Sequence, residues 1–390
     1  MKKSIQVLWL CSWYPNEEDA YVGDFIQRQA QATALITPVT LFYIHKTTDP
    51  KLAGKESIRE NGHLKEVIRY NYVPGQSGLS KLMGLARYLL GHIRFLKLYI
   101  QTYGKPDLIH VQVPIKAGVM ALLFKWMYNI PYVVTEHYGI YNPYLNDHYK
   151  TRSVFFRWMT RMVVRNADKL LTVSHSLGED MNRWVIQKAF EVVPNVVDTS
   201  LFHFKNTDRK SVFRFLHISN MIPLKNVGGM IEAVDLLRRE RQDFELVFVG
   251  DIVEEYRTLA KNKKLNEKFI FFKGVMPYEA VAEQMQASQS LIIFSDTESQ
   301  SCVVLEALCS GKPVIVTNVG GVKELVDEGN GLKTEPGDVA ALAKKMNEMM
   351  NQYHEFNTQE ISTKAQSKYG YREVGLQISA IYNAVLKSKD

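Results

Sequence analysis

The sequence contains few cysteines, no long apolar run and none of several common binding motifs. Its three cysteines, Cys11, Cys302 and Cys309, are an odd number without metal-ligand spacing, which argues against a disulfide framework and favours a reducing cytoplasm. No run of 18 apolar residues occurs, so we expect no membrane-spanning helix. Neither an Asp-x-Asp motif nor a histidine cluster is available for a metal ion. No Gly-x-Gly-x-x-Gly follows a predicted strand, which argues against a Rossmann dehydrogenase.

Length and composition predict a soluble protein of two domains. At 390 residues the chain is too long for one ordinary hydrophobic core. With 46% hydrophobic and 23% charged residues, it has the composition of a soluble globular protein. Lys2 and Lys3 precede an apolar run at residues 5–11, as in a signal peptide. Aromatic residues and a proline follow that run instead of small residues, so we interpret it as the first buried strand.

Strand and helix patterns alternate along the chain, which predicts an α/β fold with parallel sheets covered on both faces. In the first half, apolar and β-branched runs predict strands at residues 5–11, 39–44, 108–111, 132–135, 169–173 and 190–193. In the second half, they predict strands at residues 213–218, 245–249, 269–272, 290–294 and 313–317. The polar stretch 195–206 separates the two sets. We therefore expect two Rossmann-like domains that face across a cleft.

Two glutamates, Glu298 and Glu306, with seven residues between them, lie in the most informative segment of the chain. The pattern places Glu298 at the carboxyl end of a strand and Glu306 inside the following helix. In an open α/β sheet, ligands bind beyond the carboxyl ends of the strands, and a helix N-terminus there favours anions. Ionised carboxylates only accept hydrogen bonds, so the pair suits a ligand rich in hydroxyls, such as a nucleotide sugar. Alternatively, Glu298 caps the helix and Glu306 is an ordinary solvated residue.

The sequence around this pair resembles the donor-binding region of the retaining glycosyltransferases of family 4, which have the GT-B fold. The resemblance rests first on a Glu-Ala helix, a Gly-x-Pro-Val strand, a paired glycine turn and a closing Pro-Gly-Asp, which run from Leu305 as LEALCSGKPVIVTNVGGVKELVDEGNGLKTEPGD. Three segments upstream are also similar to the family: ADKLLTVSHSLGEDM from Ala167, VVPNVVDTSLF from Val192 and HISNMIPLKNVGGMIEAV from His217. The implied domains are residues 1–198, on the acceptor side, and 199–369, which would bind the nucleotide sugar. Residues 370–390 would form a helix that packs back on the first domain.

The resemblance implies roles for residues of the second domain. Glu306 would hold the ribose hydroxyls, Glu298 would lie by hydroxyls of the donor sugar, and Lys225 would bind the departing diphosphate. The family's arginine in the same loop is Asn220 here, and the loss of a charge-assisted contact weakens leaving-group stabilisation by about 1.5 to 3 kcal/mol. The remaining donor-binding candidates are the backbone N–H groups of Ser301, Cys302 and Val303, and the base-binding segment Gly274, Val275 and Met276.

Two features of the first domain are expected to face the same cleft. The segment SWYPNEEDAYVGDFIQRQ resembles the family's glycine-bearing loop, where Gly23 would let the backbone approach the phosphate or acceptor, although the usual paired glycines are absent. His137 follows the strand at 132–135 and matches the family's strand-end histidine, which positions the sugar or acceptor. We assign it a catalytic and acceptor-side role, and interpret His110 as a buried structural residue.

The positive charge is concentrated in the first half of the chain. Residues 1–200 contain 24 Lys and Arg against 16 Asp and Glu, and the remainder is nearly balanced. The excess includes two segments that mix basic with apolar residues, at 81–97 and 150–169. Basic amphipathic helices bind anionic membrane surfaces, and many family members extend lipid-linked acceptors. Alternatively, these are ordinary helices whose apolar side faces their own sheet. No DNA- or RNA-binding motif accompanies the charge, so nucleic acid is not expected.

The resemblance thus implies a metal-independent, retaining hexosyltransferase that moves a sugar from a UDP- or GDP-linked donor to a saccharide or lipid-linked acceptor. No cofactor is expected. The implied setting is cell-surface polysaccharide, lipopolysaccharide or glycolipid synthesis, in the cytoplasm or peripherally on the inner face of the cytoplasmic membrane. Two alternatives stay open: a nucleotide-sugar epimerase or hydrolase of the same fold, and a catalytically inactive binding relative, which Asn220 favours.

Overall fold

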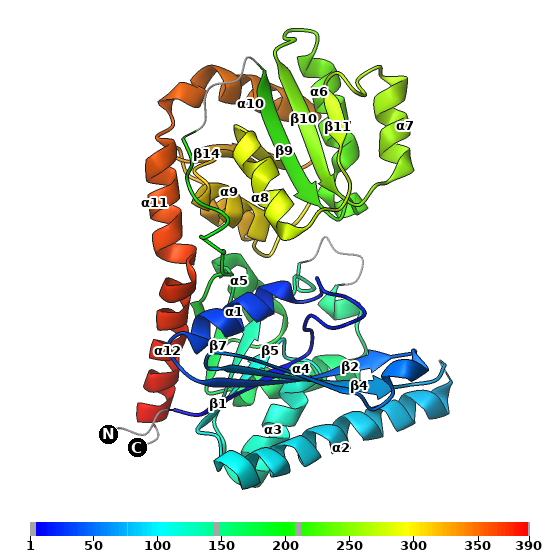
Figure 1. The fold of residues 1–390 in the computed structure, drawn as a ribbon, viewed down its shortest axis with the longest axis vertical. Coiled ribbons are helices and arrows are strands. Elements are labelled where there is room, and N and C mark those ends of the chain that lie inside the picture. The colour runs from blue at the N-terminus through cyan, green and yellow to red at the C-terminus, as the bar shows by residue number, and fades with distance from the viewer. Residues whose placement is uncertain (1–4, 76, 143–147, 207–211, 389–390) are drawn as a thin grey trace. The chain divides into compact units, whose positions relative to one another are not determined.

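The computed structural model describes residues 5–75, 77–142, 148–206 and 212–388 (Figure 1). Lys2 and Lys3, which were considered as part of a signal peptide, lie outside the described residues. The chain divides into two compact units. Unit 1 comprises Met1–Val196 together with Tyr371–Asp390, and unit 2 comprises Val197–Gly370. The division lies two residues before the predicted boundary at 198, and the closing helix belongs to unit 1.

Unit 1 contains an eight-stranded sheet in the order β3-β4-β2-β1-β5-β6-β7-β8. All neighbouring strands are parallel except β3 and β4, which form an antiparallel pair. The strands are β1 Val7–Cys11, β2 Val39–Thr47, β3 Glu56–Asn61, β4 Leu64–Tyr72, β5 Leu108–Gln112, β6 Tyr132–Glu136, β7 Lys169–Thr172 and β8 Phe190–Val192. The six predicted strands are present, whereas β3 and β4 were not predicted. β3 is mostly exposed and highly charged, so it has no apolar run to reveal it.

Helices cover both faces of this sheet. Alternate residues of β1 point to opposite faces, with Leu8 and Leu10 in one core and Val7 and Trp9 in the other. The helices of the first core are α2 Gly78–Tyr103, α3 Ala117–Tyr128, α4 Val154–Asn166 and α5 His175–Trp184. The helices of the second core are α1 Asp24–Ala34 and α12 Tyr371–Lys387. α12 packs closely on α1 because Gly375 has no side chain, and a Cβ there would lie 2.1 Å from the carbonyl oxygen of Ala32.

Unit 2 contains a six-stranded parallel sheet in the order β11-β10-β9-β12-β13-β14. Its strands are β9 Phe213–Ser219, β10 Phe244–Gly250, β11 Ile270–Phe272, β12 Ser290–Ile293, β13 Val314–Thr317 and β14 Gly331–Thr334. Its helices are α6 Val227–Leu237, α7 Glu254–Asn262, α8 Tyr278–Ala287, α9 Cys302–Cys309, α10 Val339–Gln352 and α11 Thr358–Tyr369. Five strands were predicted, and β14 was not, because it has only four residues and little apolar character.

Five short 3-10 helices complete the described chain: η1 Pro50–Leu52, η2 Tyr149–Thr151, η3 Pro223–Lys225, η4 Val322–Leu325 and η5 Tyr353–Glu355. In unit 2 the strand order reverses between β9 and β12, since β10 and β11 follow on one side and β13 and β14 on the other. In unit 1 the same reversal falls between β1 and β5. These topological switch points are where open parallel sheets bind ligands, beyond the carboxyl ends of the strands.

Within the described ranges, no helix is both long and apolar enough to cross a lipid bilayer.

Candidate functional site

Lys225 and Glu298 meet at the switch point of unit 2. Lys225 ends η3, which follows β9, and Glu298 lies in the loop after β12. The two loops are joined by the backbone N–H of Asp296, which donates to the carbonyl of Leu224 at 2.9 Å. The Lys225 ammonium donates to Glu298 Oε1 at 2.6 Å, and the Ser295 hydroxyl donates to the same oxygen at 2.9 Å. The structure therefore pairs two side chains that stand 73 positions apart in the sequence.

The paired glycines after β13 contact the backbone of the Glu298 loop. The N–H of Gly321 donates to the carbonyl of Glu298 at 2.9 Å. Gly320 has φ +45°, and a Cβ there would lie 1.9 Å from the same carbonyl oxygen. A side chain at position 320 would thus collide with the Glu298 backbone. The glycine turn lets the two loops approach closely enough to fix Glu298 against Lys225.

Glu306 lies in α9 and is almost completely buried, with 3% of its surface exposed. Tyr278, the first residue of α8, donates its hydroxyl to Glu306 Oε1 at 2.6 Å. An ionised carboxylate can accept about four hydrogen bonds, so the bond from Tyr278 does not exhaust its capacity. This arrangement differs from the solvated residue that the sequence left open as an alternative. Tyr278 was not predicted, because nothing in the local sequence links it to a residue 28 positions away.

The start of α9 supplies the predicted backbone donors. Ser301 is the N-cap residue, and its side chain makes no capping hydrogen bond. The first N–H groups of a helix have no partner within the helix, so those of Ser301, Cys302 and Val303 point out of its N-terminus. Together with the partial positive charge of the helix end, they favour an anion there. Glu298 stands three positions before the N-cap residue Ser301, so the carboxylate lies in the loop that leads into the N-terminus of α9.

The other donor-binding candidates also lie in loops after strands of unit 2. Asn220 directly follows β9 and is exposed. Gly274, Val275 and Met276 follow β11, where the carbonyl of Gly274 accepts from the N–H of Gly250 at 3.0 Å. Val275 is exposed, whereas Met276 packs against the core that contains α8 and α9. All of these residues are at the carboxyl edge of the sheet, which is the edge that the switch-point rule selects.

In unit 1, His137 directly follows β6 and is buried. Its Nε2 lies 2.8 Å from Oε1 of Gln112, at the end of the neighbouring strand β5. Because an amide oxygen only accepts, Nε2 carries the proton in this pairing. Burial lowers the pKa of His137 to about 3, so the ring is neutral near pH 7. The neutral ring then has its acceptor lone pair on Nδ1.

Gly23 occupies the loop after β1, at the start of α1, with φ +72°. A Cβ at this position would come within 3.1 Å of the Trp13 and Tyr14 backbone. The glycine therefore has a demonstrable role in closing its own loop. This loop lies beside the turn that carries His137, since the rings of Phe25 and His137 are 4.9 Å apart and those of Trp13 and Tyr138 are 5.1 Å apart.

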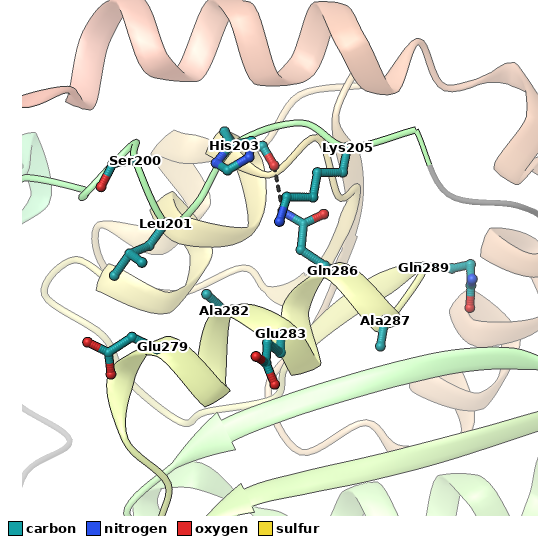
Figure 2. A pocket seen from close by; sticks show the side chains of 10 residues that line it. All are labelled: Ser200, Leu201, His203, Lys205, Glu279, Ala282, Glu283, Gln286, Ala287 and Gln289. Carbon is teal, nitrogen blue, oxygen red and sulfur yellow. Dashed lines mark hydrogen bonds between the residues drawn. The ribbon is translucent and has the colours of Figure 1, made fainter.

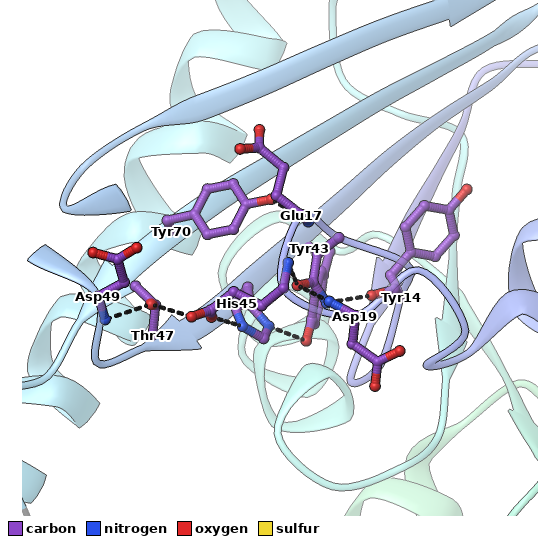
Figure 3. A network of polar contacts seen from close by, with 10 residues as sticks. Tyr14, Glu17, Asp19, Tyr43, His45, Thr47, Asp49 and Tyr70 are labelled. Carbon is purple, nitrogen blue, oxygen red and sulfur yellow. Dashed lines mark hydrogen bonds and ion pairs between the residues drawn. The ribbon is translucent and has the colours of Figure 1, made fainter. Parts of the chain in front are cut away.

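A network of polar contacts holds the same loop to β2 and β4 (Figure 3). Glu18 accepts from the Thr47 hydroxyl at 3.0 Å and lies 2.6 Å from Nε2 of His45. The N–H of Glu17 donates to the Tyr70 hydroxyl at 2.9 Å. These contacts fix the segment between β1 and α1, although the segment has no regular secondary structure. The loop that carries Gly23 is thus held in one conformation by contacts within unit 1.

Glu136 is a buried carboxylate beside His137 that sequence reasoning missed. Its Oε1 accepts from the N–H groups of His137 and Tyr138, at 2.8 and 2.9 Å, and its Oε2 accepts from the Tyr141 hydroxyl at 2.7 Å. It fixes the turn on which His137 stands. Burial raises the pKa of Glu136 from 4.5 to about 7, against the opposing effect of these hydrogen bonds. The one available signal was an acidic residue at the end of the apolar run YVVTE.

We expect the pKa of Glu136 to make stability depend on pH. A carboxyl whose pKa is raised on folding stabilises the folded state below pH 4.5, and this contribution is lost as the pH rises through about 7. The shift corresponds to about 3 kcal/mol. Glu136→Gln removes the titration and nearly preserves the shape. Urea unfolding from pH 5 to 8 should therefore show the variant gaining on the wild type by most of that amount as pH rises. A difference that stays constant with pH would mean that the carboxyl titrates at its ordinary pKa.

His110 is fully buried on β5, as interpreted from the sequence. Its Nδ1 lies 2.6 Å from the hydroxyl of Tyr382, and its Nε2 lies 2.7 Å from the hydroxyl of Thr135. The Tyr382 hydroxyl also accepts from the indole N–H of Trp9 at 3.0 Å. His110 therefore connects the sheet to α12, and burial lowers its pKa to about 3.

A separate cavity of about 470 Å³ lies in unit 2 between α8 and the segment after residue 199 (Figure 2). In it, the side-chain amide of Gln286 donates to the carbonyl of His203 at 2.5 Å. None of the predicted site residues lines this cavity, and we do not place the donor there. In the part of the chain that the structure describes, no group of three or more His, Cys, Asp or Glu residues is arranged to hold a metal ion.

Two family models match the chain. Glycosyl transferases group 1 matches residues 198–371, and Glycosyltransferase Family 4 matches residues 39–201. Among curated relatives, an uncharacterised glycosyltransferase of Methanocaldococcus jannaschii is 28% identical over 76% of this chain and 78% of its own length. TuaC of Bacillus subtilis, named for teichuronic acid biosynthesis, is 26% identical over 87% and 88%. The N-acetyl-alpha-D-glucosaminyl L-malate synthase of Bacillus anthracis is 27% identical over 72% and 75%.

Solved structures confirm the predicted GT-B fold. Sucrose-phosphate synthase from Thermosynechococcus elongatus superposes with a TM-score of 0.75 at 19% identity, over 98% of this chain and 100% of that one. HepE of Anabaena in complex with UDP superposes with a TM-score of 0.73 at 18% identity, over 97% and 100%. At these identities the likeness establishes the fold alone.

Proposed function

Because this chain belongs to the group 1 and family 4 glycosyltransferases, we propose that it transfers a hexose from a UDP- or GDP-sugar to a saccharide or lipid-linked acceptor, with retention of anomeric configuration. The observation that carries the proposal is the ion pair between Lys225 and Glu298 at the switch point of unit 2. It brings a cation for the leaving group and an acceptor for sugar hydroxyls to the edge where such sheets bind nucleotides.

The proposed reaction breaks the bond between the anomeric carbon and the phosphate oxygen. Its main electrostatic demand is stabilisation of the departing diphosphate while positive charge develops on the sugar ring. Lys225 and the N–H groups at the start of α9 meet the first demand. The acceptor hydroxyl oxygen forms the new bond on the face that the diphosphate leaves, and its proton passes to a phosphate oxygen. In this scheme Glu298 binds sugar hydroxyls and forms no covalent bond.

The Lys225–Glu298 pair holds an ammonium group in the proposed donor site before the donor binds. In the structure the ammonium is paired with Glu298, and the two side chains are 21% and 10% exposed. When the donor binds, the diphosphate competes with the carboxylate for the ammonium, and the sugar hydroxyls donate to the carboxylate oxygens that are released. Donor binding thus replaces the ammonium–carboxylate contact by two sets of charge-assisted contacts, from the ammonium to the diphosphate and from the sugar hydroxyls to the carboxylate. Neither charge is left buried without a partner during the exchange.

The acceptor side is proposed to lie in unit 1. His137 is neutral and buried there with an acceptor nitrogen, which suits a hydroxyl of the sugar or of the acceptor. Glu136 holds the backbone of His137 in place, which we assign as a positioning role. Relatives named for teichuronic acid and glucosaminyl malate synthesis favour a saccharide or small polar acceptor in cell-surface or related assembly.

The inactive-relative alternative rests on Asn220, which is exposed and uncharged where the family has arginine. Thermal unfolding with a panel of UDP- and GDP-sugars tests donor binding, since a ligand that binds only the folded state raises the melting temperature. At 100 times the dissociation constant, the stabilisation is about 2.7 kcal/mol. The donor that stabilises the protein should then be consumed only when a saccharide or lipid-linked acceptor is added. Consumption without acceptor would indicate a hydrolase or epimerase, and binding without consumption would support the inactive alternative.

A further inference from the structure

A hydrogen-bond relay of buried side chains connects the closing helix α12 to His137. Tyr382 of α12 contacts His110 of β5, and His110 contacts Gln112, two positions along the same strand. Gln112 in turn contacts His137, which follows β6. The first three of these side chains have no exposed surface, and His137 is 8% exposed. α12 packs beside α1 in unit 1, so the whole relay belongs to one unit (Figure 1).

The direction of each bond in the relay follows from groups that can only donate or only accept. At the far end, the carbonyl of Gln29 accepts from the Thr33 hydroxyl at 2.8 Å. Thr33 also forms a side-chain hydrogen bond with Tyr382, so the Thr33 oxygen accepts the Tyr382 proton. The Tyr382 oxygen is then left as an acceptor, and it already accepts from the indole N–H of Trp9 at 3.0 Å.

His110 passes this direction on to Gln112 and His137. Its Nδ1 donates to the Tyr382 oxygen at 2.6 Å, which leaves the lone pair of the ring on Nε2. The Thr135 hydroxyl donates to that lone pair at 2.7 Å, and the side-chain N–H of Gln112 donates to it at 3.3 Å. With its nitrogen toward His110, Gln112 presents its oxygen to Nε2 of His137 at 2.8 Å. His137 therefore carries its proton on Nε2.

The two histidines are thus held in complementary tautomers. Burial lowers the pKa of both rings to about 3, so each ring has a single N–H near neutral pH. One amide lies between their Nε2 atoms, so only one of those atoms can be protonated. Reversal of the Gln112 amide would move both protons and would set a lone pair of His110 against the Tyr382 oxygen. Tyr382 therefore disfavours the reversed arrangement.

We propose that Gln112 and Tyr382 are positioning residues for His137, because they hold its ring in the tautomer that leaves the acceptor on Nδ1. Gln112 acts directly, and Tyr382 acts through His110. The proposal rests on the proposed function, in which His137 accepts from a hydroxyl of the sugar or of the acceptor. It adds a role for the closing helix, since α12 determines which ring nitrogen of His137 is the acceptor.

The tautomers can be measured in the full-length protein without any substrate. Long-range proton–nitrogen NMR spectra of protein labelled at histidine distinguish a protonated from an unprotonated ring nitrogen, and single-histidine variants assign the signals. Near neutral pH we expect the proton on Nε2 of His137 and on Nδ1 of His110. The same tautomer in both rings, or a proton on Nδ1 of His137, would overturn the proposal.

Tyr382→Phe should change the tautomer of His137. The variant removes the acceptor for Nδ1–H of His110, and an unsatisfied buried donor is costly. His110 should then carry its proton on Nε2, Gln112 should turn its oxygen toward that ring, and the ratio of the His137 tautomers should change by about fivefold or more. The matched control is Tyr132→Phe, which removes another fully buried tyrosine hydroxyl, one that donates to a main-chain carbonyl of α4 at 2.6 Å. It should leave both tautomers unchanged, and an equal change in the two variants would contradict a specific role for Tyr382.

Transfer assays separate positioning from general destabilisation. Gln112→Met keeps the length of the side chain and removes both polar atoms, so kcat should fall by about fivefold or more in Gln112→Met and in Tyr382→Phe. Binding of UDP or GDP, which the proposed function assigns to unit 2, should stay within about twofold in both, as should both properties of Tyr132→Phe. Circular dichroism confirms folding of each variant.

Unchanged transfer in folded Gln112→Met and Tyr382→Phe would refute the positioning role. Absence of transfer in the wild type would instead count against the proposed function. The NMR spectra would still decide whether Gln112 and Tyr382 set the tautomer of His137, because they need no donor or acceptor.

Discussion

Replacement of Glu306 by alanine should abolish the stabilisation that a nucleotide sugar gives the wild-type protein. The proposed ribose contact is two hydrogen bonds to a charged group, and each is worth about 1.5 to 3 kcal/mol. Losing both lowers affinity by at least two orders of magnitude. A donor that raises the wild-type melting temperature by about 5 to 10 °C, as expected for a saturated unit of this size, should leave that of the variant unchanged. Differential scanning fluorimetry measures both.

The control for this variant is Tyr278→Phe. It removes the hydroxyl that donates a hydrogen bond to Glu306 and leaves the carboxylate in place. Tyr278→Phe should retain the donor-induced shift, and both variants should show a similar loss of stability without ligand. An undiminished shift in Glu306→Ala would contradict the ribose assignment. Loss of the shift in both variants would indicate that the structure of α8 and α9, and not the carboxylate itself, governs binding.

Replacement of Glu298 by alanine should separate binding from transfer. The variant loses the group proposed to hold the donor sugar, so kcat/KM for transfer should fall about 10- to 150-fold, the equivalent of one charge-assisted hydrogen bond. The response to the free nucleoside diphosphate should persist, because Lys225 no longer has a carboxylate 2.6 Å away to compete with the diphosphate. Calorimetric titration with UDP or GDP, alongside a transfer assay, measures the two effects.

Ser295→Ala is the matched control for Glu298. It removes the second donor to Glu298 Oε1 and leaves the ion pair with Lys225. The variant should transfer sugar within a few fold of the wild type. Equal loss of nucleotide binding in Glu298→Ala and Glu306→Ala would show that the two carboxylates do not have the separate roles assigned to them.

The sheets could be predicted where strands are buried and apolar. The run VIVT of β13, for example, has no other reasonable interpretation, because a short β-branched run between turns is typical of a buried parallel strand. The antiparallel pair of β3 and β4 was missed for the opposite reason. β3 consists of ESIREN on an exposed edge, and the Asn61-Gly62 dipeptide, which begins at its last residue, was the available hairpin signal.

The candidate site could be predicted only for residues that lie in sequence segments with a family pattern. Glu298 and Lys225 were each identified from their own segment, but their ion pair depends on which strands are neighbours, since β9 and β12 are adjacent while β10 and β11 intervene in the sequence. Gln112 and Tyr278 were missed because their contacts with His137 and Glu306 arise from packing between elements. Long-range hydrogen bonds of this kind have no local pattern.

The return of α12 to unit 1 has a consequence for the order in which the protein is made. Val374, Ile378, Tyr382 and further residues of α12 complete a core whose remaining buried members come from the first 196 residues. A ribosome that adds about 5 to 20 residues per second needs roughly 10 to 35 s to translate the 174 residues between the two parts of that core. Throughout that interval Trp9 and the apolar side of α1 have no cover from α12. The nascent chain therefore exposes apolar surface during synthesis, and we expect chaperones to bind it until its final helix emerges.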